Sequence, residues 1–255
     1  MTRREWIAAA VAATSAPKAE ELVIEASTGR VVHTDFARAH REPVGSLVKV
    51  FTALAYAARH EYRYPKAIIC RGESTGCWFA AGHGSVDLVN AIAHSCNSYF
   101  LELARGVTQQ DASQVAASYR IAPPVVDSAE ARIGLGLGWL ETPEAIALAY
   151  LTLIRRRQEP GVPPIVEGLR QCARQGTAKV CGKGVLAKTG TSVCVHRRKM
   201  PGDGWAIALF PEDSPRYAVL VREHGVPGAT AANRLTAHFR RASARAASIG
   251  RTFKA

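Results

Sequence analysis

Segments with the composition of β-strands stand near both ends of this 255-residue chain, and the sequence between them is mostly helical in pattern. The expected strands cover residues 20–27, 31–33, 185–192, 204–210 and 217–223, and a last helix is expected at 231–248. Strands far apart in sequence can bury their apolar faces in one shared sheet. The order therefore predicts an α+β fold, with an antiparallel sheet flanked by helices. A helical lobe at about 50–175 is inserted between the N-terminal hairpin and the C-terminal strands.

A small-residue turn at Pro43 and Gly45 leads into an apolar helix expected to run from Ser46 to about Arg59. Ser46 and Lys49 are the polar side chains of its first turn, and residues three apart share a helix face. An amine beside a hydroxyl is an arrangement that activates a serine nucleophile. The alternative is an ordinary helix start, with a capping serine and a solvated lysine.

Two further polar groups follow in the chain. Ser95 and Asn97 lie two residues apart, in a turn expected between a helix opened by Ser85 and another that begins near Tyr99. The first C-terminal strand carries Lys188-Thr189-Gly190-Thr191. A turn between helices can present both of its side chains to a cleft, although capping of the next helix is the simpler reading of Ser95 and Asn97 alone.

In this order, Ser46-x-x-Lys49, Ser95-x-Asn97 and Lys188-Thr189-Gly190 resemble the active-site signature of penicillin-binding proteins and serine β-lactamases. The resemblance extends over residues 20–245, nearly the whole chain. The further segments that are similar to transpeptidase domains are His83-Gly84, Thr142-Pro143, Gly176-Thr177-Ala178 and Gly204-Trp205. The resemblance implies the transpeptidase fold and an acyl-enzyme reaction, with no cofactor and no metal.

The resemblance also implies a role for each motif residue. Ser46 is the expected nucleophile toward D-Ala-D-Ala stem peptides of peptidoglycan or toward β-lactams, Lys49 the base that takes its proton, and Ser95 the relay to the leaving nitrogen. The backbone N–H groups of Ser46 and Thr191 form the implied oxyanion hole.

The remaining motif residues are implied to bind substrate. Asn97 holds the substrate's amide, and Lys188 keeps the cleft positive. Thr189 and Thr191 bind the terminal carboxylate, and Gly190 leaves room for substrate beside the strand.

The sequence leaves the fate of the acyl-enzyme open between a DD-transpeptidase and a class D-like β-lactamase or DD-carboxypeptidase. Asn97 favours the penicillin-binding side, because class D enzymes usually carry an apolar residue there, while the compact motif spacing is like class D. No glutamate is evidently placed to activate a deacylating water. A non-catalytic domain that senses β-lactams or cell-wall peptide is the alternative from another class.

The N-terminus has the features of an export signal. Arg3 and Arg4 precede a short apolar segment, and small residues follow at 14–16, in the manner of a twin-arginine-type signal. We therefore expect residues 1–19 to direct export to the periplasm or another extracytoplasmic location, and residues 20–255 to form the transpeptidase-like domain.

The formal net charge of +12 favours anionic partners such as the acidic cell envelope. The basic residues are scattered, and no nucleic-acid-binding motif accompanies them, so the sequence predicts no nucleic-acid partner.

Six cysteines are compatible with an oxidising compartment. Cys70 with Cys77 and Cys172 with Cys181 could each close a small loop as a disulfide, which leaves Cys96 and Cys194 as buried thiols. Because no C-x-x-C spacing occurs, the sequence predicts no zinc site.

Overall fold

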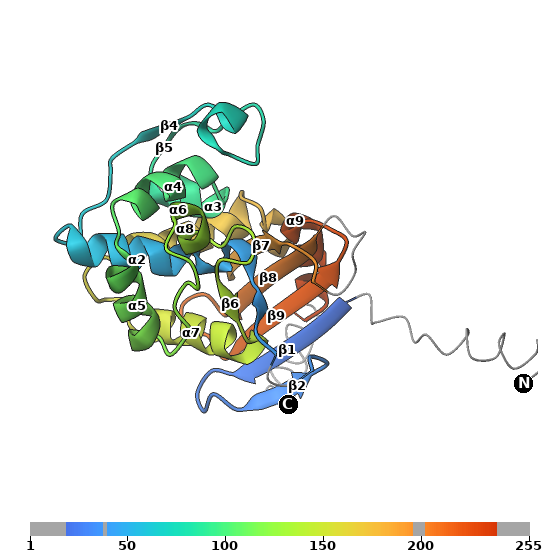
Figure 1. The fold of residues 1–255 in the computed structure, drawn as a ribbon. Helices are drawn as coiled ribbons and strands as arrows, with labels where there is room; N and C mark the ends of the chain where they lie inside the picture. The colour runs from blue at the N-terminus through green and yellow to red at the C-terminus, as the bar shows by residue number, and fades with distance from the viewer. Residues whose placement is uncertain (1–18, 38–39, 196–201, 239–255) are drawn as a thin grey trace, which may run out of the picture.

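The computed structural model describes residues 19–37, 40–195 and 202–238, and it has the predicted α+β fold with one five-stranded antiparallel sheet. The strands are β1 (Ala19–Glu25), β2 (Val31–Thr34), β7 (Leu186–Ser192), β8 (Asp203–Phe210) and β9 (Tyr217–His224). Their order in the sheet is β2-β1-β9-β8-β7. The N-terminal hairpin therefore pairs with the last strand, and β7 is an edge of the sheet (Figure 1).

The helices form the insertion between β2 and β7. They are α2 (Lys49–Arg59), α3 (Leu88–Ala93), α4 (Asn97–Arg105), α5 (Gln109–Ser118), α6 (Ala129–Arg132), α7 (Pro143–Arg155) and α8 (Pro163–Arg174), with α9 (Gly228–Ala231) after the sheet. Two short pairs, β3 (Glu42–Pro43) with β6 (Leu140–Glu141) and β4 (Ile68–Cys70) with β5 (Gly84–Val86), connect them. No helix in the described part of the chain is long and apolar enough to cross a bilayer.

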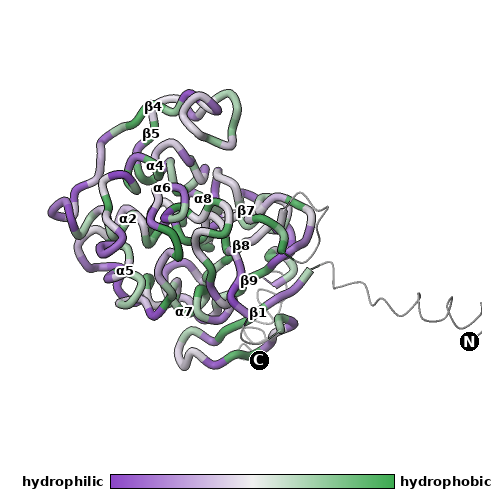
Figure 2. The backbone as a smooth tube through the Cα atoms, in the orientation of Figure 1, coloured by the Kyte–Doolittle hydropathy of each residue, from purple (hydrophilic) through white to green (hydrophobic). Residues whose placement is uncertain are grey.

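The two faces of the sheet bury different sets of residues because side chains alternate along each strand. One face, with Leu186, Ile207 and Leu220, packs with α2 and α7 in the main core. The other face, with Ala187, Ala206 and Val221, is covered by the end of α8 and by the segment that contains α9. In Figure 2 the apolar colour gathers along the strands and the inner helices, where these layers meet.

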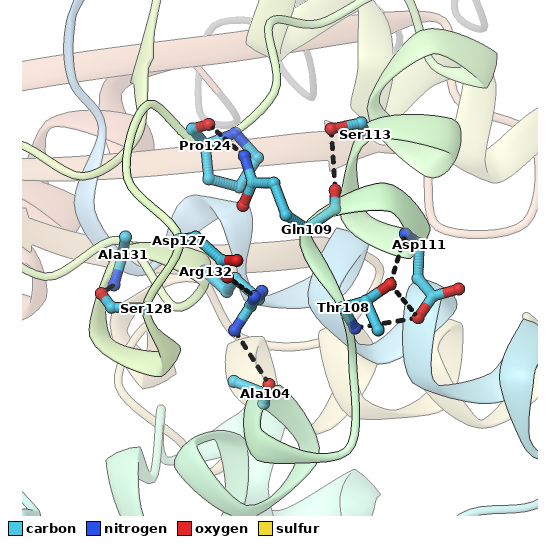
Figure 3. A network of polar contacts seen from close by, with 10 residues as sticks. All are labelled: Ala104, Thr108, Gln109, Asp111, Ser113, Pro124, Asp127, Ser128, Ala131 and Arg132. Carbon is cyan, nitrogen blue, oxygen red and sulfur yellow. Dashed lines mark hydrogen bonds and ion pairs between the residues drawn. The ribbon is translucent and has the colours of Figure 1, made fainter.

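Polar contacts fix the outer helices of the lobe. Thr108 and Asp111 form a capping box at the start of α5: the Asp111 N–H donates to Thr108 Oγ1 at 3.1 Å, and the Thr108 N–H to Asp111 Oδ2 at 2.8 Å. Nearby, buried Arg132 pairs with Asp127 and donates to the Ala104 carbonyl (Figure 3). The capping box fixes the start of α5, and the Arg132 bond joins α6 to the end of α4.

An ion cluster is buried where the sheet meets β3. Arg222 of β9 is paired with both Glu20 of β1 and Glu42 of β3. Its guanidinium lies 5.2 Å from the ring centroids of Phe36 and of Trp205. The cluster joins the first and last strands to the segment that leads into the Ser46 turn.

Most sequence-based elements agree with the structure, with two corrections. Ser85 does not cap a helix: it lies in β5, and Asp87 caps α3 by accepting from the Asn90 N–H at 2.8 Å. The expected helix at 231–248 begins as a short 3₁₀ turn at Ala232–Leu235, and its residues from 239 lie outside the described residues. The export signal at 1–19 likewise falls outside them, apart from Ala19.

Candidate active site

The Ser46 turn is a 3₁₀ turn, Gly45–Val48, that continues into α2. Gly45 has φ +56°, and a Cβ there would lie 2.4 Å from the Thr191 carbonyl oxygen, so glycine is required for this close approach. A Cβ on Gly190 would lie 2.8 Å from the Val44 carbonyl oxygen and 3.2 Å from the Ser46 nitrogen. The position that a Gly190 side chain would take is therefore filled by the backbone of the Ser46 turn. The two glycines thus set Ser46 against β7.

Lys49 is fully buried, one helical turn after Ser46. Its Nζ donates to the Ser95 carbonyl at 2.8 Å and to Asn97 Oδ1 at 2.6 Å, and it lies 3.4 Å from Ser95 Oγ. Burial, together with the nearby charge of Lys188, holds the pKa of Lys49 well below its usual value. A buried amine with a lowered pKa can act as a base near neutral pH.

Ser95 forms the turn between α3 and α4, as the sequence predicted, and Asn97 is the first residue of α4. Ser95 has φ +53°, a conformation that costs free energy in a residue other than glycine. Its carbonyl accepts from Lys49 and also from Trp78 Nε1 at 3.0 Å. These donors hold the turn, so that the Ser95 hydroxyl points toward both buried lysines.

Lys188 approaches the same hydroxyl from the sheet. It lies on the β7 face that carries Leu186, and its Nζ donates to Ser95 Oγ at 2.9 Å and to the Thr189 carbonyl at 2.6 Å. Burial lowers the pKa of Lys188 to about 8. Helix α2, the α3–α4 turn and strand β7 therefore bring Lys49, Ser95, Asn97 and Lys188 into one cluster.

The two threonines of β7 differ in exposure and in the hydrogen bonds of their hydroxyl groups. Thr189 is buried, and its hydroxyl is 2.6 Å from that of Thr177, so it is occupied within the protein. Thr191 is exposed, and its oxygen accepts from the Gly228 N–H at 3.0 Å, which leaves its hydroxyl proton available to another acceptor. Of the two threonines expected to bind a carboxylate, Thr191 is therefore the one whose hydroxyl proton is not used within the protein.

Trp78 was missed by the sequence analysis. The residue is 56 % exposed, although its indole N–H donates to the Ser95 carbonyl. With Phe79, His94 and Thr177 it lines an open groove of about 880 Å³. None of the motif residues lines this groove, which meets them through the bonds of Trp78 to Ser95 and of Thr177 to Thr189. An aromatic residue in a loop gives no signal of such a role in the sequence, because the contact of Trp78 with Ser95 arises from the folding of the β4–β5 segment.

The cysteines also differ from expectation, because neither expected disulfide is formed. Cys70 and Cys77 each lie with Sγ 3.5 Å from His83 Nδ1, and Cys77 Sγ is 4.0 Å from Cys96 Sγ. Cys172 is buried, with its sulfur 3.4 Å from the Thr177 hydroxyl. The spacing of these residues indicated no metal site, yet four metal-ligating side chains meet beside Ser95.

No protein-family pattern matches the chain, and no curated protein matches it in sequence. The fold, by contrast, is that of the transpeptidase domains of penicillin-binding proteins, which are matched over about 85 % of the chain.

The matching structures come from several bacteria. PBP2 of Pseudomonas aeruginosa, solved with WCK 5153, has TM-score 0.71 and 16 % identity over 84 % of this chain and 68 % of its own. The D,D-transpeptidase domain of an Eggerthella lenta peptidoglycan glycosyltransferase has TM-score 0.68 and 16 % identity, covering 88 % and 77 %. PBP2 of Helicobacter pylori has TM-score 0.69 and 17 % identity over 85 % of this chain, which spans 58 % of that protein.

Proposed function

We propose that this protein is a penicillin-binding serine DD-transpeptidase-like enzyme that forms an acyl-enzyme with D-Ala-D-Ala stem peptides and with β-lactams. The observation that carries the proposal is the Ser95 hydroxyl between two buried lysines, 2.9 Å from Lys188 Nζ and 3.4 Å from Lys49 Nζ. The acyl-enzyme of penicillin-binding protein A from Mycobacterium tuberculosis with ceftriaxone, at TM-score 0.62 and 18 % identity, adds support from a protein of the same fold.

In the proposed reaction, Ser46 Oγ attacks the carbonyl carbon of the scissile amide, and Lys49 in its neutral form takes the hydroxyl proton. The proton passes through the Ser95 hydroxyl to the leaving nitrogen, and the amine departs. The backbone N–H groups of Ser46 and Thr191 stabilise the oxyanion, at about 10²–10³ in rate for each donor.

The substrate's carboxylate is proposed to lie between Lys188 and the Thr191 hydroxyl. Lys188 carries a positive charge below about pH 8, because its pKa is about 8. Asn97 already accepts a hydrogen bond from Lys49 through Oδ1, so its amide nitrogen is the group offered to substrate. The groove lined by Trp78 and Thr177 is the place for the rest of the peptide.

We propose slow deacylation, which favours a transpeptidase over a β-lactamase. The glutamates of the β3–β6 pair, which leads into the Ser46 turn, are both engaged. Glu42 is paired with Arg222, and Glu141 accepts from the Ala122 and Thr142 N–H groups. Neither carboxylate is therefore placed as a free base for water.

A fluorescent penicillin tests the proposal directly. The purified protein should gain one covalent label per chain, seen in a gel and as a mass increase, and Ser46→Ala should gain none. Ser118→Ala, an exposed serine at the end of α5, is the matched control and should label like the wild type. Labelling that persists in Ser46→Ala would reject the nucleophile.

The kinetics with a chromogenic β-lactam separate a slow-deacylating enzyme from a β-lactamase. A burst of one equivalent followed by a stall supports the slow-deacylating enzyme, whereas sustained turnover supports a β-lactamase. Absence of any burst, together with reversible binding of the β-lactam, is the result expected of a sensing domain that is not acylated.

Because stem peptides lie outside the cytoplasmic membrane, we also propose that the protein acts there after export. Protease added to spheroplasts should degrade it while a cytosolic marker remains intact. Full protection of both proteins would contradict export.

A further inference from the structure

Three cysteines and one histidine converge on one point at the edge of the candidate active site. Cys70 ends β4, Cys77 and His83 lie in the β4–β5 loop, and Cys96 stands between Ser95 and Asn97. One ligand atom from each, three sulfurs and an imidazole nitrogen, lies within 4.8 Å of every other. The three cysteines are buried, and His83 is half-buried. Three cysteine sulfurs and one imidazole nitrogen this close to one another are a zinc-type donor set.

The separations agree with tetrahedral coordination. With Zn–S of about 2.3 Å and Zn–N of about 2.0–2.1 Å, tetrahedral angles put sulfur about 3.6 Å from nitrogen and about 3.8 Å from another sulfur. The observed values are 3.5 Å for Cys70 and for Cys77 to His83 Nδ1, and 4.0 Å between Cys77 and Cys96. A disulfide would need about 2.05 Å between sulfurs.

Hydrogen-bond donors surround the sulfurs as they do in thiolate centres. The Ser98 hydroxyl donates to Cys70 Sγ at 3.3 Å, and the backbone N–H groups of Gly72 and His83 also point to this sulfur. The Ser98 hydroxyl is in turn 2.7 Å from the Thr75 hydroxyl. Such outer contacts stabilise the charged form of ligand sulfurs and fix their direction.

The loop itself is folded tightly around the cluster. Gly72 has φ +69°, and a Cβ there would lie 1.8 Å from the Ala80 carbonyl oxygen. The Cys77 N–H donates to the Gly72 carbonyl at 3.0 Å, which closes a short turn around the sulfurs. Only a backbone without a side chain fits this turn, so the loop conformation that gathers the ligands is specified by the sequence.

We propose that Cys70, Cys77, His83 and Cys96 bind one zinc ion, which fastens the β4–β5 loop to the turn that carries Ser95 and Asn97. Binding takes three thiolates and a neutral imidazole, so the thiol protons leave to solvent. All four positions are filled by protein, so the ion is structural and takes no part in acyl transfer. The same fastening sets Trp78 on the Ser95 carbonyl.

Metal content tests the proposal independently of any reaction with β-lactams. The full-length protein, purified without chelator and supplied with Zn²⁺, should hold one zinc per chain by elemental analysis. Co²⁺ in its place should give sulfur-to-cobalt charge-transfer bands and the intense visible bands of tetrahedral coordination. Cys77→Ser, His83→Ala and Cys96→Ser should each lose the zinc and these bands.

The control is Cys181→Ser, a half-buried cysteine outside the cluster, which should retain the metal. Folding of each variant is checked by circular dichroism, and the wild type offers a test without mutation: a chelator should lower its Tm, and Zn²⁺ should restore it. Binding that survives in Cys77→Ser and Cys96→Ser, or a disulfide between Cys70 and Cys77 in protein purified without oxidant, would overturn the proposal.

Discussion

Lys49 of α2 and Lys188 of β7 meet at one hydroxyl, that of Ser95, which lies 3.4 Å from the first Nζ and 2.9 Å from the second. Both ammonium groups are fully buried, and each disfavours the charge of the other. The pair therefore holds one positive charge more readily than two. In the proposed mechanism Lys188 keeps that charge, and Lys49 is the neutral base.

Replacing Lys49 by arginine tests the base. Arginine keeps the positive charge but, with a pKa above 12, cannot accept the Ser46 proton. We expect the second-order rate constant for acylation by fluorescent penicillin to fall by about 10²–10⁴, the usual contribution of a general base. Stopped-flow fluorescence measures this rate, and a loss of less than tenfold would contradict the role of Lys49.

The acylation rate should depend on pH with two limbs. Lys49 is neutral above its lowered pKa, so the rate rises with pH as it loses its proton. Lys188 is charged below about pH 8, so attraction of an anionic β-lactam weakens as pH increases beyond that value, by roughly tenfold per pH unit.

Lys188→Arg distinguishes the two limbs of that profile. Arginine remains charged, so the alkaline limb should move to higher pH while the acidic limb stays in place. If the acylation rate of this variant still decreases above about pH 8, a group other than Lys188 causes the decrease.

Gly190→Ala tests the packing of β7 against the Ser46 turn. The added Cβ would lie 2.8 Å from the Val44 carbonyl oxygen, so the turn must shift. We expect a loss of about 1–3 kcal/mol in the free energy of unfolding, together with at least a tenfold slower acylation. Urea denaturation and the labelling rate measure the two effects.

Gly136→Ala is the matched control for that variant. Its Cβ would meet nothing within 4 Å, but φ is +61°, so it should cost stability alone. If both variants slow acylation equally, the effect does not come from the Ser46 turn.

Arg222→Ala should strongly destabilise the protein. It leaves the buried carboxylates of Glu20 and Glu42 without their shared partner, which typically costs about 3–5 kcal/mol. Arg30→Ala, which breaks the exposed pair with Glu25, should cost less than about 1 kcal/mol. Urea unfolding measures both losses in the free energy of unfolding. Equal losses in the two variants would contradict the claim that the buried ion pairs of Arg222 matter more than the exposed pair of Arg30.

The fold was predictable from the sequence because its strands and its long helices carry strong local signals. The Thr142-Pro143 start of α7 is an example, since the Thr142 hydroxyl accepts from the Ala145 N–H as a cap should. The helix start predicted at Ser85 was wrong. A serine followed by an acidic residue is typical of a helix cap, but Ser85 lies in β5, which pairs with β4.

The cluster of Lys49, Ser95, Asn97 and Lys188 was predictable in its members but not in its contacts. The motifs named Lys49, Ser95 and Lys188, yet their meeting at one hydroxyl depends on how α2, α4 and β7 pack. The Cys/His cluster was missed because its spacing, Cys70-x₆-Cys77-x₅-His83-x₁₂-Cys96, follows no common zinc pattern. Its one sequence signal is the gathering of cysteine, histidine and glycine in a single loop.

The pairing of β1 with β9 also constrains the order of folding. Glu20 and Arg222, 202 residues apart, lie opposite each other in the sheet. The two ends of this long segment must therefore meet before β1 and β9 can pair. Contacts between such distant residues form slowly, whereas the helical insertion can collapse as soon as it leaves the ribosome. Strand β1 of the N-terminal hairpin must then wait for its second partner, β9, until the last strand has been synthesised. Lys188 meets Ser95 through the same late-arriving part of the chain, so nascent protein that ends before β7 lacks this contact.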